Sequence, residues 1–474
     1  MKISMIAKRV VLAGLVLAIG ACDDGLTEVN ENPNQPTDVG AQFLLPQSLN
    51  AGVANTFGGG QMLSHTAIWS YQGVELQYPD EEEGFMRASR AQGYWDGYYA
   101  GPLADIQIVI NKGIEDGSGS IEGVGLIWKS WLFHIVTDSW GDIPYSQALQ
   151  AIDGVTTPSY DSQQQIYDGL IAALADGASK VGSGADFASG DLLYGNDFTK
   201  WRKFANSLRM RLAMRMSEVN PGTAQTAFAA AYAAGGFTSN ADNAMFDWPG
   251  APYENPLYEN WTGRDDHGIS ELMVETLKAM SDPRLELYAE PATIDGEYRG
   301  LVNGDITPEH SLSWYSRIGD HWRADGSSTP TAIMTYSEVL FLQAEAAARG
   351  WIAGDPAALY EAGIRANMTQ WDADNSPTSA EIDAYIAATP YTGIADIQLQ
   401  NWIGLYMNGQ EAWAHVRRTD VPARTPGPDL TLSRIPTRFT YPTLEQSLNL
   451  ENYQAAVARQ GADELTTTVW WQIH

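Results

Sequence analysis

The sequence predicts a mainly α-helical protein built from stacked helix pairs, and three observations support this. Apolar residues recur at helical spacing in several separate segments. One of these segments continues through a short turn into a second helix, and such a pair cannot bury its apolar face alone. Neighbouring pairs must therefore stack on it, as they do in helical-repeat arrays. The chain of 474 residues exceeds one typical small core, so we expect either two domains or one large repeat-built unit.

The first two predicted helices lie in the second quarter of the chain. Asp161 or Ser162 can cap the first of them. Its apolar face is formed by Ile166, Leu170, Ala173 and Leu174. The stripe of the second helix consists of Trp201, Phe204, Ala205, Leu208 and Leu212. Residues 182–197, between the two, are rich in Gly and Asp and are expected to form a loop.

The clearest unit is a predicted helix pair between residues 331 and 371. Its first helix ends at Gly350, as expected for a C-terminal glycine cap. Asp355 and Pro356 restart a helix with a capping residue and a proline at its first position. The spacing of Ala, Gly and Tyr only partly matches a tetratricopeptide unit, and no strict period emerges. One further helix is predicted over residues 399–418.

The N-terminus predicts a secretory signal peptide over residues 1–21. It begins with Lys2, Lys8 and Arg9 and continues as an apolar or small run from Val10 to Ala21. That run of 12 residues is shorter than the about 20 that a membrane-spanning helix needs. We therefore expect this segment to be removed rather than to anchor the protein.

The only cysteine in the sequence, Cys22, directly follows this segment. The run Ile19-Gly20-Ala21-Cys22 resembles a bacterial lipobox, in which the cysteine receives lipid on its sulfur and then on its new amine. Two or more acyl chains, at about 0.8 kcal/mol for each buried CH₂, anchor a protein durably. The alternative is ordinary secretory cleavage with a free thiol. Residues 22–40 are acidic, Asn-rich and interrupted by Pro, which indicates an extended tether.

Charge and motifs exclude several functions. A formal charge of −30 excludes nucleic acid as a partner, because nucleic acid needs a basic surface. The chain contains no HExxH, GxSxG, phosphate-loop or dinucleotide motif. We therefore predict no catalytic residue, no metal site and no cofactor. The one basic cluster, residues 200–215, suggests either an anion site or a helix face paired with nearby carboxylates, and we favour the second.

The aromatic residues are the best indication of a ligand. The chain has 16 Trp and 22 Tyr against 12 Phe. Rings with a polar tip suit stacking on sugars or closing over a small apolar ligand, and the alternative for each single ring is a place in the core. Residues 240–330 are aromatic-rich and Pro-rich with weak helical periodicity, which predicts a loop-rich stretch at the surface. The predicted ligand contacts are Trp248, Tyr253, Tyr258, Trp261, Trp314 and Trp322, together with Tyr78 and Trp95. Arg264 and Asp265 are predicted to hydrogen-bond sugar hydroxyls.

Five long segments resemble the SusD/RagB family of nutrient-binding outer-membrane lipoproteins. They are VTDSWGDIPYSQALQ at 136–150, TPSYDSQQQIYDGLIAAL at 157–174, GDLLYGNDFTKWRKFANSLRMRLAMR at 190–215, QNWIGLYMNGQEAWAHVRRTDVP at 400–422 and IPTRFTYPTLEQSLNLENYQAAV at 435–457. The resemblance implies one mainly α-helical domain over residues 41–474, with a tetratricopeptide-like scaffold and a loop-rich ligand face. Residues 240–330 would form a loop-rich insertion within that domain.

The same resemblance implies a function. Members of the family are lipid-anchored in the outer membrane, capture glycans or sometimes peptides, and pass them to a SusC-like TonB-dependent transporter. They bind and do not cut. We therefore expect a non-enzymatic lipoprotein facing the cell exterior, whose partners are an oligosaccharide and the transporter. A surface glycoside hydrolase and a structural or adhesive lipoprotein are the alternatives. Ligand residues vary within the family, so none is carried over.

Overall fold

The computed structural model describes residues 39–324, 327, 329–371, 374 and 376–473. The chain divides into two compact units, residues 1–40 and residues 41–474. The predicted signal peptide, Cys22 and nearly all of the predicted tether lie outside the described residues. The larger unit, residues 41–474, contains the helices and strands of the described chain.

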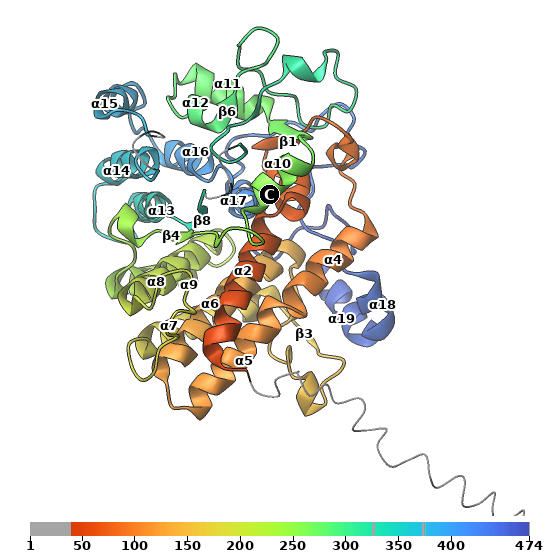
Figure 1. Ribbon diagram of the computed structural model, residues 1–474, viewed down its shortest axis with the longest axis vertical. Helices are drawn as coiled ribbons and strands as arrows, with labels where there is room; N and C mark the ends of the chain where they lie inside the picture. Colours follow the sequence, from red (N-terminus) through yellow and green to blue (C-terminus); the bar gives the residue numbers. More distant parts are fainter. Residues whose placement is uncertain (1–38, 325–326, 328, 372–373, 375, 474) are drawn as a thin grey trace, which may run out of the picture. The chain divides into compact units, whose positions relative to one another are not determined.

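Helices make up most of this unit (Figure 1). The N-terminal half contains α2 (Ala41–Phe57), the π-helix η1 (Gly59–Thr66), α3 (Ala67–Trp69), α4 (Ala88–Tyr99), α5 (Pro102–Glu115), α6 (Gly119–Trp140), α7 (Gln163–Lys180), α8 (Phe198–Arg215) and α9 (Pro221–Ala234). The C-terminal half contains α10 (Pro256–Gly263), α11 (Glu271–Ala279), α12 (Leu285–Tyr288), α13 (Tyr336–Ala348), α14 (Pro356–Met368), α15 (Ser379–Ala388), α16 (Ile394–Gly404), α17 (Gly409–Thr419), α18 (Thr443–Leu448) and α19 (Leu450–Gln460).

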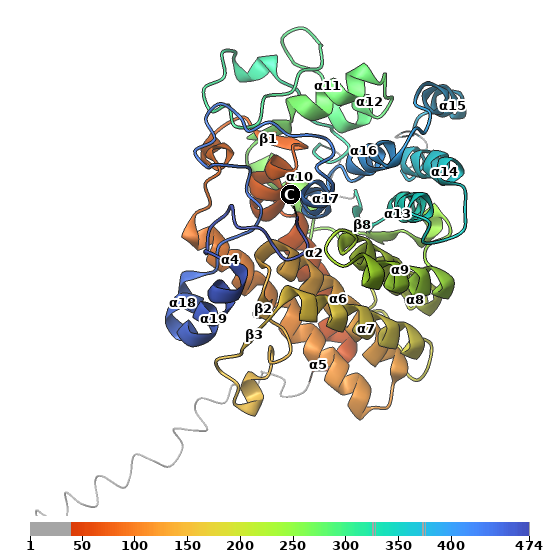
Figure 2. The ribbon, with the colours of Figure 1, turned by 180° about the vertical axis from the view of Figure 1, so that it is seen from behind.

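The scaffold is a continuous stack of helices, each packed on the next. Helix α5 packs on α6, α6 on α7, α7 on α8, and α8 on both α9 and α13, which in turn packs on α14. Figure 1 shows this series running through α5, α6, α7, α8, α13 and α14 to α15. In Figure 2 the C-terminal helices α18 and α19 lie apart from it, beside α4 and β3. The fold is therefore mainly α-helical and built from stacked pairs, as the sequence predicts.

Helix boundaries follow local capping chemistry. Ser162 caps α7 and, with Gln165, forms a capping box. The helix predicted over 399–418 is wrong in one respect, because it is broken into α16 and α17. Met407 has a φ of 62°, and the side chain of Asn408 accepts a hydrogen bond from the Glu411 backbone N–H. A capping residue behind a left-handed residue ends one helix and begins another.

Short strands bring the loop-rich stretch together with the N-terminal half. The main sheet is antiparallel and has the order β1 (Gly73–Glu75), β5 (His267–Ile269), β7 (Arg317–Ile318) and β6 (Ala289–Glu290). Glu75 pairs with His267, and Gly268 pairs with Arg317. Two smaller sheets pair β2 (Ile143–Pro144) with β3 (Tyr160–Asp161), and β4 (Ala244–Phe246) with β8 (Thr331–Met334). Residues 331–334, expected at the start of a helix, form β8 instead because they pair with β4.

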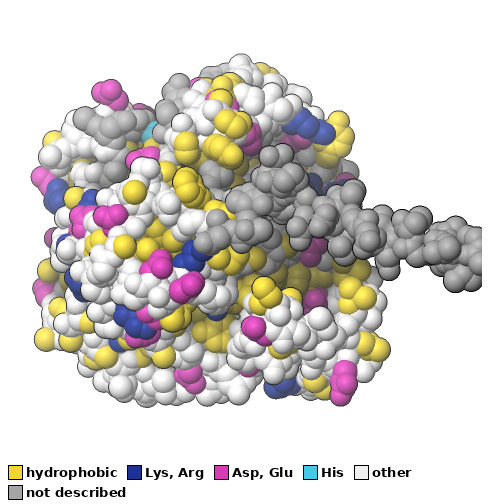
Figure 3. Space-filling view, turned by 60° about the horizontal axis from the view of Figure 1, so that its bottom comes forward, with side chains coloured by type: hydrophobic (Ala, Val, Ile, Leu, Met, Phe, Trp, Pro, Cys, Tyr) yellow, Lys and Arg dark blue, Asp and Glu magenta, His cyan; other side chains and the backbone are white. Residues whose placement is uncertain are grey.

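Buried ion pairs account for much of the basic cluster. Arg211 Nε lies 2.6 Å from Glu338 Oε1, both side chains being buried, and Arg215 pairs with Glu411. The more exposed Lys203 pairs with Asp242 at 2.8 Å. The interpretation of this cluster as a helix face paired with carboxylates is confirmed for these three residues, whereas Arg202 donates to backbone carbonyls and Arg209 to the Asn206 side chain. On the face in Figure 3, acidic side chains lie among apolar and neutral ones, and Lys and Arg form small separate groups.

Candidate functional site

Tyr78 is a large exposed aromatic residue beside the main sheet. It follows β1, and 66% of its surface is exposed. Its φ of 57° is left-handed, which is unfavourable for a residue with a bulky side chain. Such conformations persist only where surrounding contacts impose them, and they occur often at ligand sites. The guanidinium group of Arg264 lies 4.1 Å from the ring centroid of Tyr78, so one side of the ring is supported by the protein.

Buried carboxyl groups hold the turn that carries Tyr78. The carboxylate of Glu82, in the 3₁₀-helix η2 (Pro79–Glu83), accepts hydrogen bonds from the backbone N–H groups of Glu75 at 2.9 Å and Gly304 at 2.8 Å. Burial raises the pKa of Glu82 to about 7. Burial and the neighbouring Glu81 carboxylate raise the pKa of Glu75 far above its usual range. Arg87 donates to Glu81 at 2.9 Å. The turn is thus tied to both β1 and residue 304.

A groove of about 300 Å³ begins at Tyr78. Its walls are formed by Leu76, Tyr78, Pro79, Leu301, Ile306, Pro308 and Leu312, and its polar groups by Glu75, Gln77 and Asp305. Apolar walls with a few polar groups are typical of small-molecule sites. The groove lies between the end of β1 and residues 301–312. Asn303 joins these two segments by donating a side-chain hydrogen bond to the Gly73 carbonyl at 2.8 Å.

Four more of the predicted residues join Tyr78 on this side. Asp265 accepts hydrogen bonds from Arg317 at 3.1 Å and from Arg323 at 2.9 Å. Arg323 lies 6.0 Å from the ring centroid of Trp261. Tyr258 and Trp261 belong to α10, with ring centroids 5.9 Å apart. Arg264, which directly follows this helix, connects it to Tyr78, and Asp265 connects it to Arg317 and Arg323. We call Tyr78, Tyr258, Trp261, Arg264 and Asp265 the Tyr78 surface.

Three predicted ligand residues lie in the core instead. Trp95 is 5% exposed and packs against Tyr99 and Trp140 at centroid distances of 4.8 and 5.4 Å. Trp248 is buried and donates its indole N–H to Thr331 Oγ1 at 3.0 Å. Trp322 is buried as well. The expectation that aromatic residues of the loop-rich stretch lie at the surface does not hold for Trp248 and Trp322, and Trp95, in the other aromatic-rich stretch, lies on α4. In all three cases neighbouring elements cover the rings.

The last two predicted aromatic residues, Trp314 and Tyr253, are not among the five residues of the Tyr78 surface. Trp314 nevertheless packs against the apolar cluster that contains Leu76 and Leu301, which line the groove at Tyr78. Trp314 is half-buried and stacks on His310 at a centroid distance of 4.1 Å. The guanidinium group of Arg299 lies 4.0 Å from the same ring, so protein groups already occupy much of Trp314. Tyr253 is exposed at a tight turn in which its N–H donates to the Gly250 carbonyl at 2.7 Å.

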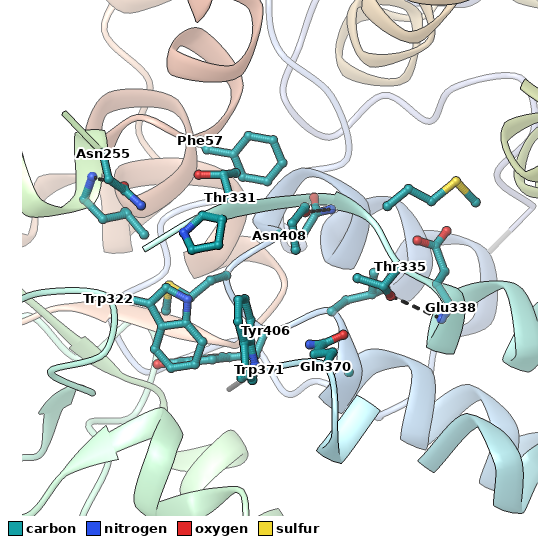
Figure 4. Close-up of a pocket in the computed structure, with 17 residues that line it drawn as sticks. Phe57, Asn255, Trp322, Thr331, Thr335, Glu338, Gln370, Trp371, Tyr406 and Asn408 are labelled. Carbon is teal, nitrogen blue, oxygen red and sulfur yellow. Dashed lines mark hydrogen bonds between the residues drawn. The ribbon is translucent and has the colours of Figure 1, made fainter. Parts of the chain in front are cut away.

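A narrow cavity lies behind Trp322 (Figure 4). Its volume of about 20 Å³ suits a single water molecule and is too small for a sugar ring. Trp322, Tyr406 and Trp371 lie together at one end of it in Figure 4. Trp371 was not among the predicted ligand residues, because the sequence pattern placed it at the end of a helix. The Asn, Ser and Pro residues that follow it are the signal that could have indicated a loop.

The described residues show neither a metal-binding cluster nor a membrane-spanning helix. Among them, no group of three or more His, Cys, Asp or Glu side chains is arranged to hold a metal ion. None of the helices in the described part of the chain has the length and hydropathy needed to cross a bilayer.

Residues 33–442 match the model of the SusD-like family, described as starch-binding associating with outer membrane. The protein belongs to the SusD-like family. Among curated proteins, no match was found. A solved structure of a chitin-binding protein is 29% identical, with a TM-score of 0.82, and the alignment covers 92% of this chain and 100% of that one.

Two other SusD homologues with solved structures are similar. The chitin-binding SusD homologue from Flavobacterium johnsoniae is 25% identical with a TM-score of 0.77, over 90% of this chain and 99% of that one. A SusD homologue from Bacteroides uniformis is 24% identical with a TM-score of 0.80, over 92% of this chain and 100% of that one. At this lower identity, the likeness shows the fold alone.

Proposed function

We propose that this protein is a cell-surface lipoprotein that binds an oligosaccharide at the Tyr78 surface and delivers it to a TonB-dependent outer-membrane transporter. The observation that carries the proposal is the exposed ring of Tyr78, supported by Arg264 at 4.1 Å, at the mouth of a 300 Å³ groove. Membership of a starch-binding family and likeness to a chitin-binding protein support it.

The chemistry of the Tyr78 surface suits a sugar. A pyranose ring presents apolar C–H groups on its faces and hydroxyl groups around its edge. The ring of Tyr78 offers a flat apolar face, and the strained backbone and Arg264 hold it in place. Gln77 and Asp305 line the groove and supply amide and carboxylate groups for hydroxyl hydrogen bonds. Trp261 extends the aromatic surface along α10.

Attachment and delivery are the remaining parts of the proposal. Acylation of Cys22 would hold the protein at the outer membrane, and residues 23–40 would separate the binding unit from it. The protein is proposed to bind without cleaving. Delivery to a transporter requires that the ligand is released uncleaved. The Tyr78 surface has aromatic and guanidinium groups, which are suited to binding.

Calorimetric titration with N-acetylglucosamine hexamer and maltohexaose tests the binding step. Tyr78→Ala and Trp261→Ala are expected to weaken binding of whichever glycan the wild type takes by tenfold or more, with melting temperatures near that of the wild type. Tyr253→Ala removes an exposed ring outside the surface and is the matched control. Equal binding by Tyr78→Ala and Tyr253→Ala would show that the ligand binds elsewhere.

Two further measurements test the other steps. Affinity purification of the acylated protein from membranes is expected to recover a TonB-dependent barrel, and Cys22→Ala is expected to leave the protein unanchored. Release of reducing sugar from a polysaccharide panel by the purified protein would instead support a glycoside hydrolase. Membrane preparations that yield the lipoprotein with no barrel would favour a structural or adhesive role.

A further inference from the structure

A second groove lies between α12 and the helices α14 and α15. Its volume is about 350 Å³, and it shares no lining residue with the groove at Tyr78. Pro283, Leu287, Met368 and Pro377 supply apolar wall, and Trp371 adds an aromatic side chain. Figure 1 shows the elements that carry these lining residues, with α12 near the top of the molecule and α14 and α15 at one end of the helical stack. The groove is large enough for a sugar unit.

Trp371 is a fixed wall of this groove. Its ring packs edge-on against His321 at a centroid distance of 4.7 Å and against Trp322 at 5.9 Å. The same side chain lines the narrow cavity of Figure 4 and the larger groove. These contacts limit rotation of the indole, so a ligand that stacks on it has little side-chain entropy to overcome.

The floor of the groove contains a cation that is already neutralised. Arg284 is buried and donates to Asp282 Oδ1 at 2.9 Å, to Asn367 Oδ1 at 2.8 Å and to Gln400 Oε1 at 2.8 Å. Its charge is balanced by Asp282, with which it also forms an ion pair. The guanidinium group is therefore a structural part of the floor. Because its charge is already compensated, it does not attract an anionic ligand.

The rim, in contrast, is acidic. Glu286 and Glu381 are exposed and line the groove. Glu381 accepts hydrogen bonds from Thr378, and these bonds lower the pKa of its carboxyl group, so it is ionised. Glu286 forms no ion pair with any residue that the structure describes. Arg284 is the only basic side chain among the described lining residues, and the chain as a whole carries a charge of −30. The groove therefore attracts cations.

We propose that this groove is a second binding site, specific for a sugar unit that carries a protonated amine in place of an acetamido or hydroxyl group. The sugar ring lies against Trp371, and its ammonium group lies near Glu286. The proposal rests on the proposed function in one respect, namely that the ligand is a glycan. It adds a separate site with a different ligand charge, because the two grooves share no lining residue.

The test is calorimetric titration of the full mature chain with a glucosamine tetramer and, in parallel, with the N-acetylglucosamine tetramer. All variants are made in a Tyr78→Ala background, so that binding at the Tyr78 surface does not mask the second site. The parent variant is expected to bind the amine form and to lose affinity as salt is raised, because an exposed charge pair is screened.

Glu286→Gln removes one charge with little change of shape. It is expected to weaken binding of the amine form two- to fivefold, the range of an exposed ion pair, and to leave the acetylated form unaffected. Glu361→Gln removes an exposed carboxylate on α14 outside the groove and is the matched control. Trp371→Ala is expected to weaken the amine form about tenfold or more. If Trp371→Ala unfolds, Glu286→Lys replaces it and is expected to abolish binding.

Equal affinities of the Glu286→Gln and Glu361→Gln variants for the amine form would overturn the proposal, as would absence of binding in the parent. Failure of the proposed function looks different. In that case Tyr78→Ala alone would leave the binding of neutral oligosaccharides unchanged, whatever happens at Trp371.

Discussion

The guanidinium group of Arg264 lies 4.1 Å from the centre of the Tyr78 ring, because the two residues lie at the same end of the antiparallel pair of β1 and β5, which joins distant parts of the chain. Arg264 is exposed and also pairs with Asp266 at 2.6 Å. The contact therefore combines a cation–π interaction with an ion pair that fixes the cation. It places an aromatic ring and a hydrogen-bond donor together at the mouth of a groove.

Replacement of Arg264 tests this contact. Arg264→Ala is expected to weaken glycan binding about two- to fivefold, because an exposed cation–π contact contributes about 0.5–1 kcal/mol. The melting temperature should stay near that of the wild type, since the residue is exposed. Calorimetry and thermal unfolding give the two values. Arg264→Lys keeps the charge but not the planar group, so it should recover only part of the affinity.

Trp95 should contribute to stability rather than to binding. Trp95→Ala is expected to lower the free energy of unfolding by about 3–5 kcal/mol, the usual cost of truncating a large buried ring. Urea denaturation measures this loss. Tyr253→Ala, at an exposed position, should change stability by less than about 0.5 kcal/mol. If Trp95→Ala changed the free energy of unfolding only slightly but abolished glycan binding, Trp95 would be a ligand contact after all.

The buried carboxyl of Glu82 makes stability depend on pH. Its pKa is about 7 in the folded chain and about 4.3 in an unfolded one, so the folded state holds the proton more tightly. The protonated Glu82 therefore contributes to the free energy of unfolding. That contribution is fully present below pH 4 and is lost as pH rises towards 7. Glu82→Gln should remove it, making the fall in stability over that interval shallower by up to about 1.4 kcal/mol per pH unit.

Urea denaturation at several pH values measures the slope for the wild type and for Glu82→Gln. Glu83→Gln, one residue further along the turn, is the matched control and should keep the wild-type slope. Identical slopes in all three proteins would mean that Glu82 does not titrate in this interval.

Removing one partner of the ion pair between Arg211 and Glu338 should lower the free energy of unfolding more than replacing both partners with apolar residues. Arg211→Met leaves the Glu338 carboxylate buried without its bidentate partner, which is expected to cost about 3–5 kcal/mol. The double variant Arg211→Met with Glu338→Leu should recover much of that loss, because two apolar side chains need no charge compensation. A double-mutant cycle in urea measures both. If the double variant were as unstable as the single one, the negative charge of Glu338 would also be needed to balance another neighbouring cation, such as Arg215.

Local signals in the sequence predicted helices better than they predicted helix ends. The Ser162 cap and the stripe of α8 lie within a few residues of what they control, and both are found. The break between α16 and α17 was missed, because it depends on Met407 adopting a left-handed conformation that apolar periodicity does not reveal. The strand at residues 331–334 was missed because its partner, β4, lies far away in the sequence.

The aromatic residues illustrate the same limit at the candidate site. Nothing in the local sequence distinguishes Trp261, beside Arg323, from Trp322, which is buried against Tyr288 and Tyr406. Trp371 was missed because it follows a helix outside the stretch that composition identified.

The sequence by itself determined the helical class, the stacking of helix pairs and the resemblance to the family, because these depend on periodicity and on long ordered segments. Only the tertiary structure decided which rings are exposed. Burial depends on long-range partners: the main sheet brings residue 78 to residue 264 and leaves Tyr78 open, whereas packing of α4 against α6 encloses Trp95. Exposure of an aromatic ring is a property of the whole fold, and composition alone does not contain it.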